Sequence, residues 1–273
     1  MDENCTYALL TGASQGFGRE LAEELAKRSI NLLLVSLPNE GLADLSMEIK
    51  SKYSVQVKYF ETDLTQEKSV YEIAEWALSN YRVFMLINNA GIGGSQSFEM
   101  ASVESLESMI QINIRAVTLL TRLMLAELKS HEKAYILNVS SMASFSPIAF
   151  KTIYPASKAF VYSFSRGLHQ ELKGTGVSVS VIHPGPMKTN AEVTKRIEKQ
   201  SFIARLGLVS PGKVARIAIK GMLQNQTQIV PGLYNKFFWL LMKIVPLTLR
   251  LNMVSDIMKN EADTTGIKRK PMS

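Results

Sequence analysis

The stretch "TGASQGFGRE" at residues 11–20 decides how the fold of this chain is interpreted. It follows a short apolar run, "YALLTG" (7–12), which has the length and composition of a buried strand. It leads into "GRELAEELAKRS" (18–29), whose apolar residues recur with helical spacing. A strand, a glycine-rich turn and a helix in this order are typical of the first unit of an α/β fold that binds a nucleotide.

The three glycines of this turn have separate mechanical uses. Gly12 allows a tight turn out of the strand, Gly16 lets the backbone approach a pyrophosphate, and Gly18 lets the helix pack closely on the sheet. The helix start at Phe17–Gly18 offers free N–H groups and the positive end of the helix dipole to phosphates. The spacing is G-x-x-x-G-x-G rather than the G-x-G-x-x-G of many dinucleotide folds, so the glycines alone are a weak signal.

Outward along the chain, short apolar strands alternate with helical patterns. Continuous apolar strands separated by helices indicate a parallel sheet covered on both faces, which is the doubly wound α/β pattern. No internal repeat or linker divides the chain, so we expect a single domain over residues 1–273. The expected strands are 7–12, 31–36, 55–60, 83–88, 134–140, 177–184 and 227–230, and the clearest helical patterns are 18–29, 66–80 and 103–130.

Composition and charge narrow the classes of function. The one cysteine, Cys5, excludes an intramolecular disulfide, and the acidic N-terminus lacks the pattern of a secretory signal, so a cytoplasmic or membrane-surface protein is expected. Residues 1–110 hold 8 Lys+Arg and 16 Asp+Glu, whereas residues 111–273 hold 23 and 8. The basic second half would suit nucleic acid, anionic lipid or a phosphorylated ligand, and the alternative is an ordinary solvated surface.

Four motifs in order carry a family resemblance. "TGASQGFG" is followed by "NNAG" (88–91) after the fourth strand, "YPASK" (154–158), and "PGPMKT" (184–189) after the sixth strand. Together they resemble the short-chain dehydrogenase/reductase family over residues 6–190. The resemblance implies a Rossmann-like parallel sheet, a nicotinamide cofactor and hydride transfer between that cofactor and a carbonyl or alcohol. No metal is implied.

The "YPASK" motif places a phenol and an amine one helical turn apart. A carbonyl that accepts hydride becomes an alkoxide and needs a proton, which a phenol can donate, although a free tyrosine has a pKa near ~10. A nearby ammonium favours the phenolate, so we expect Lys158 to lower the pKa of Tyr154. Pro155 suits the first turn of a helix.

The resemblance implies roles for the rest of a catalytic tetrad. Lys158 also holds the nicotinamide ribose, and the hydroxyl of Ser141 binds the substrate carbonyl oxygen, with the adjacent Ser140 as its rival. Asn113, in "QINIRA", holds a water that links the lysine to solvent. The alternative for Asn113 is a polar helix residue bonded to backbone.

The cofactor is expected at the carboxyl ends of the strands, and NADP(H) is favoured over NAD(H). An NAD enzyme of this architecture places an acid about ~20 residues beyond the glycines. Ser36 and Leu37 stand there, and the nearest acid is Glu40; the usual basic partner of a 2′-phosphate is also missing, which leaves Arg19 or Ser36 as its candidate contacts. The cofactor-binding residues implied by the resemblance are Gly12, Ser14, Gly16, Phe17, Gly18, Ser36, Asp63, Leu64, Asn89, Ala90, Gly91, Tyr154, Lys158, Pro184, Gly185 and Thr189. Asp63 would contact the adenine amine, or form a turn or N-cap before the helix at 66, and the two roles are compatible.

The last third of the chain matches no motif. Residues 190–210 are expected to form a substrate lid, with an apolar face and a basic rim, or else an ordinary amphipathic helix. Residues 231–259 are apolar with a cation every seven residues, and would lie in a membrane interface, cover the pocket or form a subunit contact. The tail 264–273 is expected to be flexible.

The sequence therefore favours an NADPH-dependent reductase of a hydrophobic ketone, a small-molecule substrate: a 3-oxoacyl chain, a keto-lipid such as 3-ketosphinganine, or a steroid. The alternative is a nucleotide-sensing binding protein of the same fold without catalysis. A nucleic-acid partner is not expected, because no helix-turn-helix or aromatic-interleaved basic patch occurs. The helices expected at 103–130 and 154–172 resemble those through which the family forms homo-oligomers.

Overall fold

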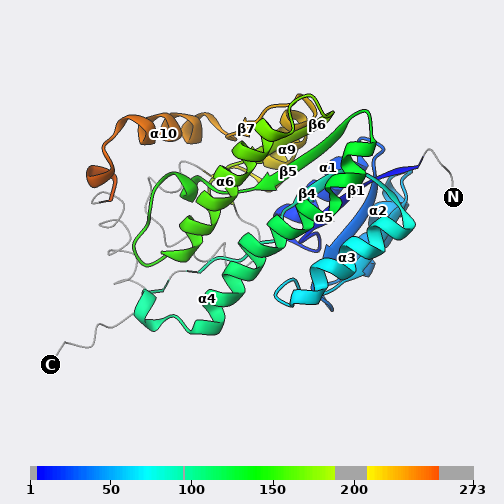
Figure 1. Ribbon diagram of the computed structural model, residues 1–273, viewed down its shortest axis with the longest axis horizontal. Helices are drawn as coiled ribbons and strands as arrows, with labels where there is room; N and C mark the ends of the chain where they lie inside the picture. Colours follow the sequence, from blue (N-terminus) through cyan, green and yellow to red (C-terminus); the bar gives the residue numbers. More distant parts are fainter. Residues whose placement is uncertain (1–4, 95, 188–207, 252–273) are drawn as a thin grey trace.

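The computed structural model describes residues 5–94, 96–187 and 208–251. Within those ranges seven strands form one sheet in the order β3-β2-β1-β4-β5-β6-β7, and every neighbouring pair is parallel (Figure 1). The strands are β1 (Thr6–Thr11), β2 (Asn31–Ser36), β3 (Val57–Glu61), β4 (Arg82–Asn88), β5 (Ala134–Val139), β6 (Val177–Ile182) and β7 (Gln228–Ile229). The predicted doubly wound α/β fold is confirmed, and each strand lies within two residues of its expected start and end.

The order of the strands fixes where a ligand can bind. The chain passes outward from β1 through β2 to β3, returns to β4 on the other side of β1, and then continues outward to β7. The direction therefore reverses between β1 and β4, and the loops that leave their carboxyl ends turn to opposite faces. In open α/β sheets, the crevice at such a switch point is where ligands bind.

Both faces of the sheet are covered, because alternate strand residues point to opposite sides. On one face Leu10 and Leu34 pack against α1 (Gly16–Ala26), α2 (Leu42–Lys52) and α9 (Pro211–Leu223). On the other, Leu9 and Leu33 pack against α3 (Glu67–Asn80) and α5 (Val117–Ser130). This double burial explains why the strands are apolar throughout instead of alternating with polar residues.

The helical pattern at 103–130 is not one regular helix. It consists of α4 (Val103–Ile110), a π-helical turn η2 (Gln111–Ala116) and α5. By length and composition alone, the whole run Val103–Ser130 could cross a membrane. Its residues Leu120, Met124 and Leu128 are instead buried in the core against the sheet, so it is a core helix of this fold.

Four further helices complete the described part of the chain. The predicted helix at "YPASK" is α6 (Ile153–Glu171), with Pro155 in its first turn. The short helix η3 (Met142–Phe145) follows β5 and contacts α6. Helix α10 (Leu233–Ile244) lies at the end of the molecule away from the N-terminus (Figure 1) and also contacts η3. The short helix η1 (Phe98–Met100) completes the set.

Some of the expectations fall on residues outside the described ranges. These are Thr189, almost all of the predicted lid, the end of the 231–259 segment and the predicted flexible tail.

Candidate active site

The glycine-rich turn joins β1 to α1 at the switch point of the sheet. Gly12 has φ +64° and Gly16 has φ +56°, a backbone conformation that other residues adopt at a cost. A Cβ on Gly12 would lie 2.8 Å from Cα of Ala90, and one on Gly18 would overlap the carbonyl oxygen of Gly12. The tight turn and the close packing predicted for Gly12 and Gly18 are therefore both present.

The start of α1 is suited to phosphates. The residue before it, Gln15, makes no side-chain hydrogen bond to the first turn, so no side chain from that position satisfies the free N–H groups of the helix. Free N–H groups and the positive end of the dipole together form an anion site. This is the observation on which the fit of a dinucleotide to the turn rests.

The β1 and β4 ends are held together by Thr11 and Asn89. The Thr11 hydroxyl accepts hydrogen bonds from the backbone N–H groups of Asn89 and Ala90, both at 3.1 Å. The Asn89 side-chain amide donates back to the carbonyl oxygens of Thr11 and Gly12 at 3.0 and 2.9 Å. Asn89, the second asparagine of the "NNAG" motif, thus fixes the glycine turn together with Thr11. The motifs in the sequence did not identify Thr11 as its partner.

Two glycines after β4 make room for the tyrosine and the lysine. A Cβ on Gly91 would lie 3.0 Å from Nζ of Lys158 and 3.2 Å from Oδ1 of Asn113. A Cβ on Gly93 would lie 3.0 Å from the ring of Tyr154. Gly91 was among the predicted site residues, whereas Gly93 was missed, although the glycine-rich run "GIGG" was a signal for it.

Asn113 lies fully buried in the π-helical turn η2. Its Oδ1 accepts from the backbone N–H of Ile92 at 3.0 Å, and its Nδ2 donates to the Ile92 carbonyl at 2.9 Å and to the Ser157 hydroxyl at 3.0 Å. Ser157 donates in turn to the carbonyl of Tyr154. Asn113 therefore clamps the loop after β4 to the start of α6. π-Helical turns within α-helices occur frequently at functional sites.

The two adjacent serines after β5 face different partners. The Ser140 hydroxyl is buried and donates to the backbone carbonyl of Lys158 at 2.8 Å, which anchors α6 to the sheet. The Ser141 hydroxyl accepts from the N–H of Ala143 at 3.2 Å and forms a hydrogen bond with the side chain of Tyr154. Of the two, Ser141 is the one beside the tyrosine, in agreement with the family spacing.

The ionisable pair on α6 departs from expectation in one respect. Nζ of Lys158 donates to the carbonyl of Val139 at 3.0 Å and lies 6.0 Å from the centre of the Tyr154 ring. Burial raises the pKa of Tyr154 above its ordinary value, and only the hydrogen bond from Ser141 lowers it. Burial also lowers the pKa of Lys158 to about 8. Contrary to our expectation, Lys158 is not among the groups that shift the pKa of Tyr154, and burial favours the protonated phenol.

At the adenosine end of the site, an acid reaches the glycine turn. The Ser14 hydroxyl donates to Oε2 of Glu40 at 2.7 Å, and Glu40 itself is exposed. The buried Ser36 donates to the Leu37 carbonyl at 3.1 Å. A carboxylate beside the turn would repel a 2′-phosphate and would suit the free hydroxyls of an NAD ribose.

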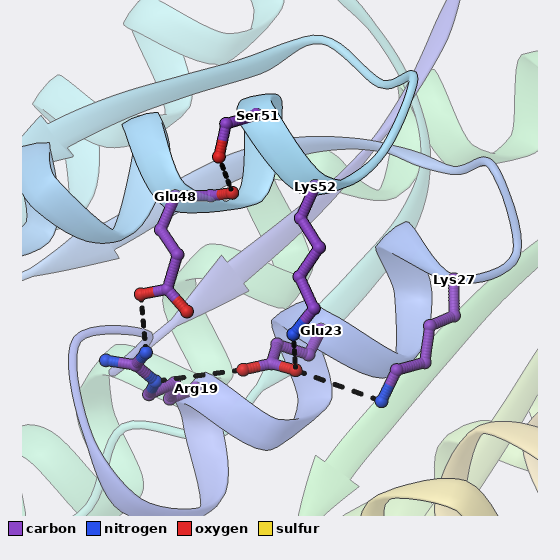
Figure 2. A network of polar contacts seen from close by, with 6 residues as sticks. All are labelled: Arg19, Glu23, Lys27, Glu48, Ser51 and Lys52. Atoms are coloured by element: carbon purple, nitrogen blue, oxygen red, sulfur yellow. Dashed lines mark hydrogen bonds and ion pairs between the residues drawn. The ribbon is translucent and has the colours of Figure 1, made fainter.

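Arg19, a candidate contact for that phosphate, belongs to a surface network (Figure 2). Its Nη2 lies 2.6 Å from Oε2 of Glu48 on α2, and its Nε lies 3.8 Å from Glu23. Glu23 also meets Lys27 and Lys52, at 3.8 and 3.4 Å. A phosphate would have to compete with Glu48 for the guanidinium group.

The remaining predicted cofactor residues lie along the same edge. Oδ1 of Asp63 accepts from the N–H of Thr65 at 2.9 Å, so this side chain forms a turn before α3. It does not cap that helix, because the N-cap position of α3 is Gln66. Leu64 is buried beside it. Pro184 accepts from the N–H of Met142 at 3.0 Å, which joins the Pro184–Gly185 segment to the turn that carries Ser141.

The arrangement as a whole places a protonated phenol, a second hydroxyl and an amine around one point at the strand ends, next to an anion-binding turn. Such a set can hold a carbonyl oxygen and give it a proton. Nothing in it resembles the nucleophile and base of a hydrolase, because Ser141 is paired with a phenol rather than with an imidazole.

Comparisons with known proteins agree with this chemistry. A family model described as short chain dehydrogenase matches residues 6–200. The very-long-chain 3-oxoacyl-CoA reductase of Anas platyrhynchos is 34% identical over 252 residues, which are 91% of this chain and 78% of that relative.

Two solved structures share the fold over most of its length. A short-chain dehydrogenase from Sphingobium yanoikuyae in complex with NADPH has a TM-score of 0.77 and 25% identity, and 98% of each chain is covered. The 3-ketoacyl-(acyl-carrier-protein) reductase from Brucella melitensis complexed with NADH has a TM-score of 0.70 and 26% identity over 84% of this chain and 97% of that one.

Proposed function

This chain belongs to the short-chain dehydrogenase family, and we propose that it is an NADPH-dependent reductase of a hydrophobic 3-oxoacyl substrate. It acts on carbonyl and alcohol groups as an NAD(P)-dependent oxidoreductase. The observation that carries the proposal is the hydrogen bond between Ser141 and a Tyr154 whose pKa is raised by burial, beside the glycine turn. A reductase needs the protonated phenol as its proton donor, whereas an enzyme that oxidises an alcohol must first deprotonate the phenol.

The residues of the strand ends suit the cofactor. The turn at Gly12–Gly18 would hold the pyrophosphate on the start of α1, and Lys158 would hold the nicotinamide ribose near Tyr154. When bound, NADPH supplies the hydride. NADP(H) is favoured because several of the structural relatives are complexes with NADPH or NADP. NAD(H) is the alternative, because one relative is a complex with NADH and because Glu40 lies beside the turn.

Side chains of the protein bind and protonate the carbonyl oxygen of the substrate. Ser141 and Tyr154 donate hydrogen bonds to the carbonyl oxygen, and the phenol transfers its proton as negative charge develops there. The Lys158 ammonium, whose pKa is about 8, stabilises the phenolate that remains. Asn113 holds the loop after β4 against the first turn of α6, which carries the tyrosine and the lysine.

The substrate class follows from the relatives. The protein from Anas platyrhynchos is named as a reductase of very-long-chain 3-oxoacyl-CoA, and the one from Brucella melitensis as a reductase of 3-ketoacyl chains on a carrier protein. A 3-oxoacyl thioester is therefore the leading substrate, ahead of a keto-lipid or a steroid. The rival function, a nucleotide-sensing binding protein, would have no use for the complete Ser141, Tyr154 and Lys158 set.

We also propose that the 231–259 segment meets an anionic membrane surface. In α10, Leu233, Phe237, Leu240 and Ile244 recur at helical spacing and are 86, 65, 52 and 74% exposed. The opposite side, with Asn235 and Met242, is buried on the protein. Lys236 and Lys243 are exposed, and the helix contains no acid. An apolar stripe with cations beside it is the pattern of a helix that lies in a membrane interface.

The membrane proposal has its own test. The protein should sediment with vesicles that contain anionic phosphatidylserine and much less with neutral phosphatidylcholine vesicles. Phe237→Ser with Ile244→Ser should abolish sedimentation, while the exposed Tyr59→Ser on β3 serves as the matched control. Equal binding of the wild-type protein and the double variant would refute the proposal.

The predicted homo-oligomer remains a proposal, which is supported by exposed apolar side chains on α4 and α6. Phe160 on α6 is exposed and stacks on Phe164, and Val103 and Ile110 on α4 are exposed as well. Sedimentation velocity should show a dimer or larger species, which Phe160→Ser should dissociate.

The activity itself is tested with a panel of substrates. Oxidation of NADPH should be fastest with long-chain 3-oxoacyl thioesters, slower with 3-ketosphinganine and steroids, and slowest with small ketones. A preference for the steroid would redirect the substrate assignment. Binding of NADPH without turnover of any of these compounds would instead favour the nucleotide-sensing alternative.

A further inference from the structure

A buried histidine lies behind the turn that carries Ser141. His183 directly follows β6, is fully buried, and receives no role from the proposed chemistry. Its backbone N–H donates to the carbonyl of Ile229 on β7, so the residue is fixed to the sheet. A polar ring at this depth requires an explanation, because burying a polar group without partners is costly.

The ring contacts the Ser141 turn at three points. Nδ1 lies 3.0 Å from the Ser144 hydroxyl and 3.2 Å from the Ser141 carbonyl oxygen. The ring centre lies 4.4 Å from that of Phe145, the last residue of η3. The ring also packs nearly perpendicular to that of Tyr162 from α6, with the ring centres 4.9 Å apart.

The hydrogen bonds decide which nitrogen carries the proton. The Ser141 carbonyl oxygen can only accept, and the Ser144 hydroxyl already donates to that oxygen at 2.7 Å. A carbonyl oxygen at 3.2 Å attracts an N–H and repels a lone pair, so the geometry favours Nδ1 of His183 as the donor to both oxygens. The other nitrogen, Nε2, is then an unprotonated lone pair, which agrees with its lack of a hydrogen-bond partner among the described residues. The relay runs from His183 through Ser144 to Ser141.

We propose that His183 is a positioning residue for the reaction: its Nδ1–H, acting through Ser144, holds the Ser141 turn so that the Ser141 hydroxyl faces Tyr154. This inference rests on the proposed reductase function for its kinetic consequence. The relay fixes the backbone of Ser141. In the same turn, the N–H of Met142 donates to the carbonyl of Pro184, the residue that follows the histidine. Because burial lowers the pKa of His183 to about 4, the ring stays neutral over the working range of pH.

Variants at two positions test the relay. Asparagine can place an amide N–H near the position of Nδ1, whereas leucine fills similar space without a donor. We expect His183→Leu to lower kcat roughly tenfold to hundredfold with little change in the KM for NADPH, and His183→Asn to recover kcat to within about threefold of wild type. Ser144→Ala should lower kcat as His183→Leu does, and the double variant should be no slower than either single one.

Three results would overturn the proposal: a folded His183→Leu protein with wild-type kcat, a His183→Asn protein as slow as the leucine variant, or a Ser144→Ala protein with unchanged kcat. If His183→Leu does not fold, Ser144→Ala, which keeps the imidazole, still decides the question.

A second measurement separates this inference from the proposed function. Nitrogen-15 NMR of the imidazole should show the Nδ1–H tautomer for His183 near neutral pH, whether or not the protein turns over any substrate. The Nε2–H tautomer would contradict the relay. A wild-type protein that has the Nδ1–H tautomer but reduces no ketone would contradict the proposed function and the kinetic role of the relay, and leave its geometry standing.

Discussion

The two ends of the proposed cofactor site are built differently. At the catalytic end, Asn113 and Lys158 are 0 and 5% exposed, and each has hydrogen-bond partners from other elements. At the adenosine end, Arg19 and Glu48 have 41 and 45% of their side chains exposed, and the Glu40 carboxylate is also at the surface. The first end depends on burial and geometry, and the second on exposed charge.

This difference determines how each end responds to change. A buried hydrogen-bonded group is costly to remove, since its partners stay unsatisfied. An exposed ion pair contributes about 0–1 kcal/mol and is screened by salt. We therefore expect substitutions at the catalytic end to affect turnover and stability strongly, whereas those at the adenosine end should only alter the preference between cofactors.

The largest effect is expected for Tyr154→Phe. This variant keeps the ring against Gly93 and loses the proton donor, so kcat for reduction of a 3-oxoacyl thioester should fall by about 10²–10⁴. Binding of NADPH, measured by fluorescence, should change little. Turnover near the wild-type rate would remove Tyr154 from its assigned role.

Asn113→Ala should cause the largest loss of stability. The alanine leaves the N–H and the carbonyl of Ile92 and the Ser157 hydroxyl without their partner, at about 1–3 kcal/mol for each buried group left unsatisfied. Urea unfolding should therefore show a loss of several kcal/mol. The matched control is Asn80→Ala, whose amide bonds only to an exposed helix end, and which should cost less than about 1 kcal/mol. Similar losses for the two variants would erase the contrast between buried and exposed positions.

The free energy of unfolding should depend on pH between 4 and 6.5 because of His183. Its pKa falls from 6.5 to about 4 on folding, so the unfolded chain binds a proton between those values that the folded chain does not. Stability is then complete above pH 6.5 and declines as the pH drops toward 4, by roughly 3 kcal/mol for a fully buried ring. The pKa of His169 is lowered too, and it contributes in the same window.

A comparison of variants isolates the His183 contribution. Stability measured against pH for wild type and for His183→Asn should differ in slope between pH 4 and 6.5, because His169 is common to both. Parallel curves would show that His183 is already uncharged in the unfolded reference or charged in the fold.

The smallest effect is expected at the adenosine end. Glu40→Gln removes the carboxylate beside Ser14, so kcat/KM with NADPH relative to NADH should rise about three- to tenfold, and less at high salt. Glu72→Gln, an exposed carboxylate on α3, is the matched control and should leave the ratio unchanged. No change in the Glu40 variant would mean that the acid does not reach the ribose.

The sequence was sufficient to predict the strands and the doubly wound fold, which depend on the pattern of apolar residues. The strands were readable because they are buried on both faces. The family resemblance named Ser141, Tyr154, Lys158 and Asn113, and their proposed roles stay predictions. The π-helical turn at 111–116 was not readable, since one extra residue per turn barely changes the apolar pattern of a long helix. The contact between Glu40 and Ser14 depends on a loop with positive φ at Asn39 and Gly41.

The error about the tyrosine has a related cause. Spacing places Lys158 one turn beyond Tyr154, but it does not show that the amine is held by the Val139 carbonyl, that Lys158 is buried or that Tyr154 is partly buried. His183 was missed because a lone histidine before a proline has no motif. Contacts between distant segments, rather than local pattern, decide all of these points.

The central claim is that burial keeps the Tyr154 phenol protonated as a ready acid at the strand ends. Alkaline titration of the ultraviolet absorbance of tyrosinate, in the wild-type protein and in Tyr154→Phe without added cofactor, isolates this one ring among nine tyrosines. The difference curve should show ionisation above pH 10.0. A transition near neutral pH would mean that the phenolate prevails in the free protein, and would contradict the account.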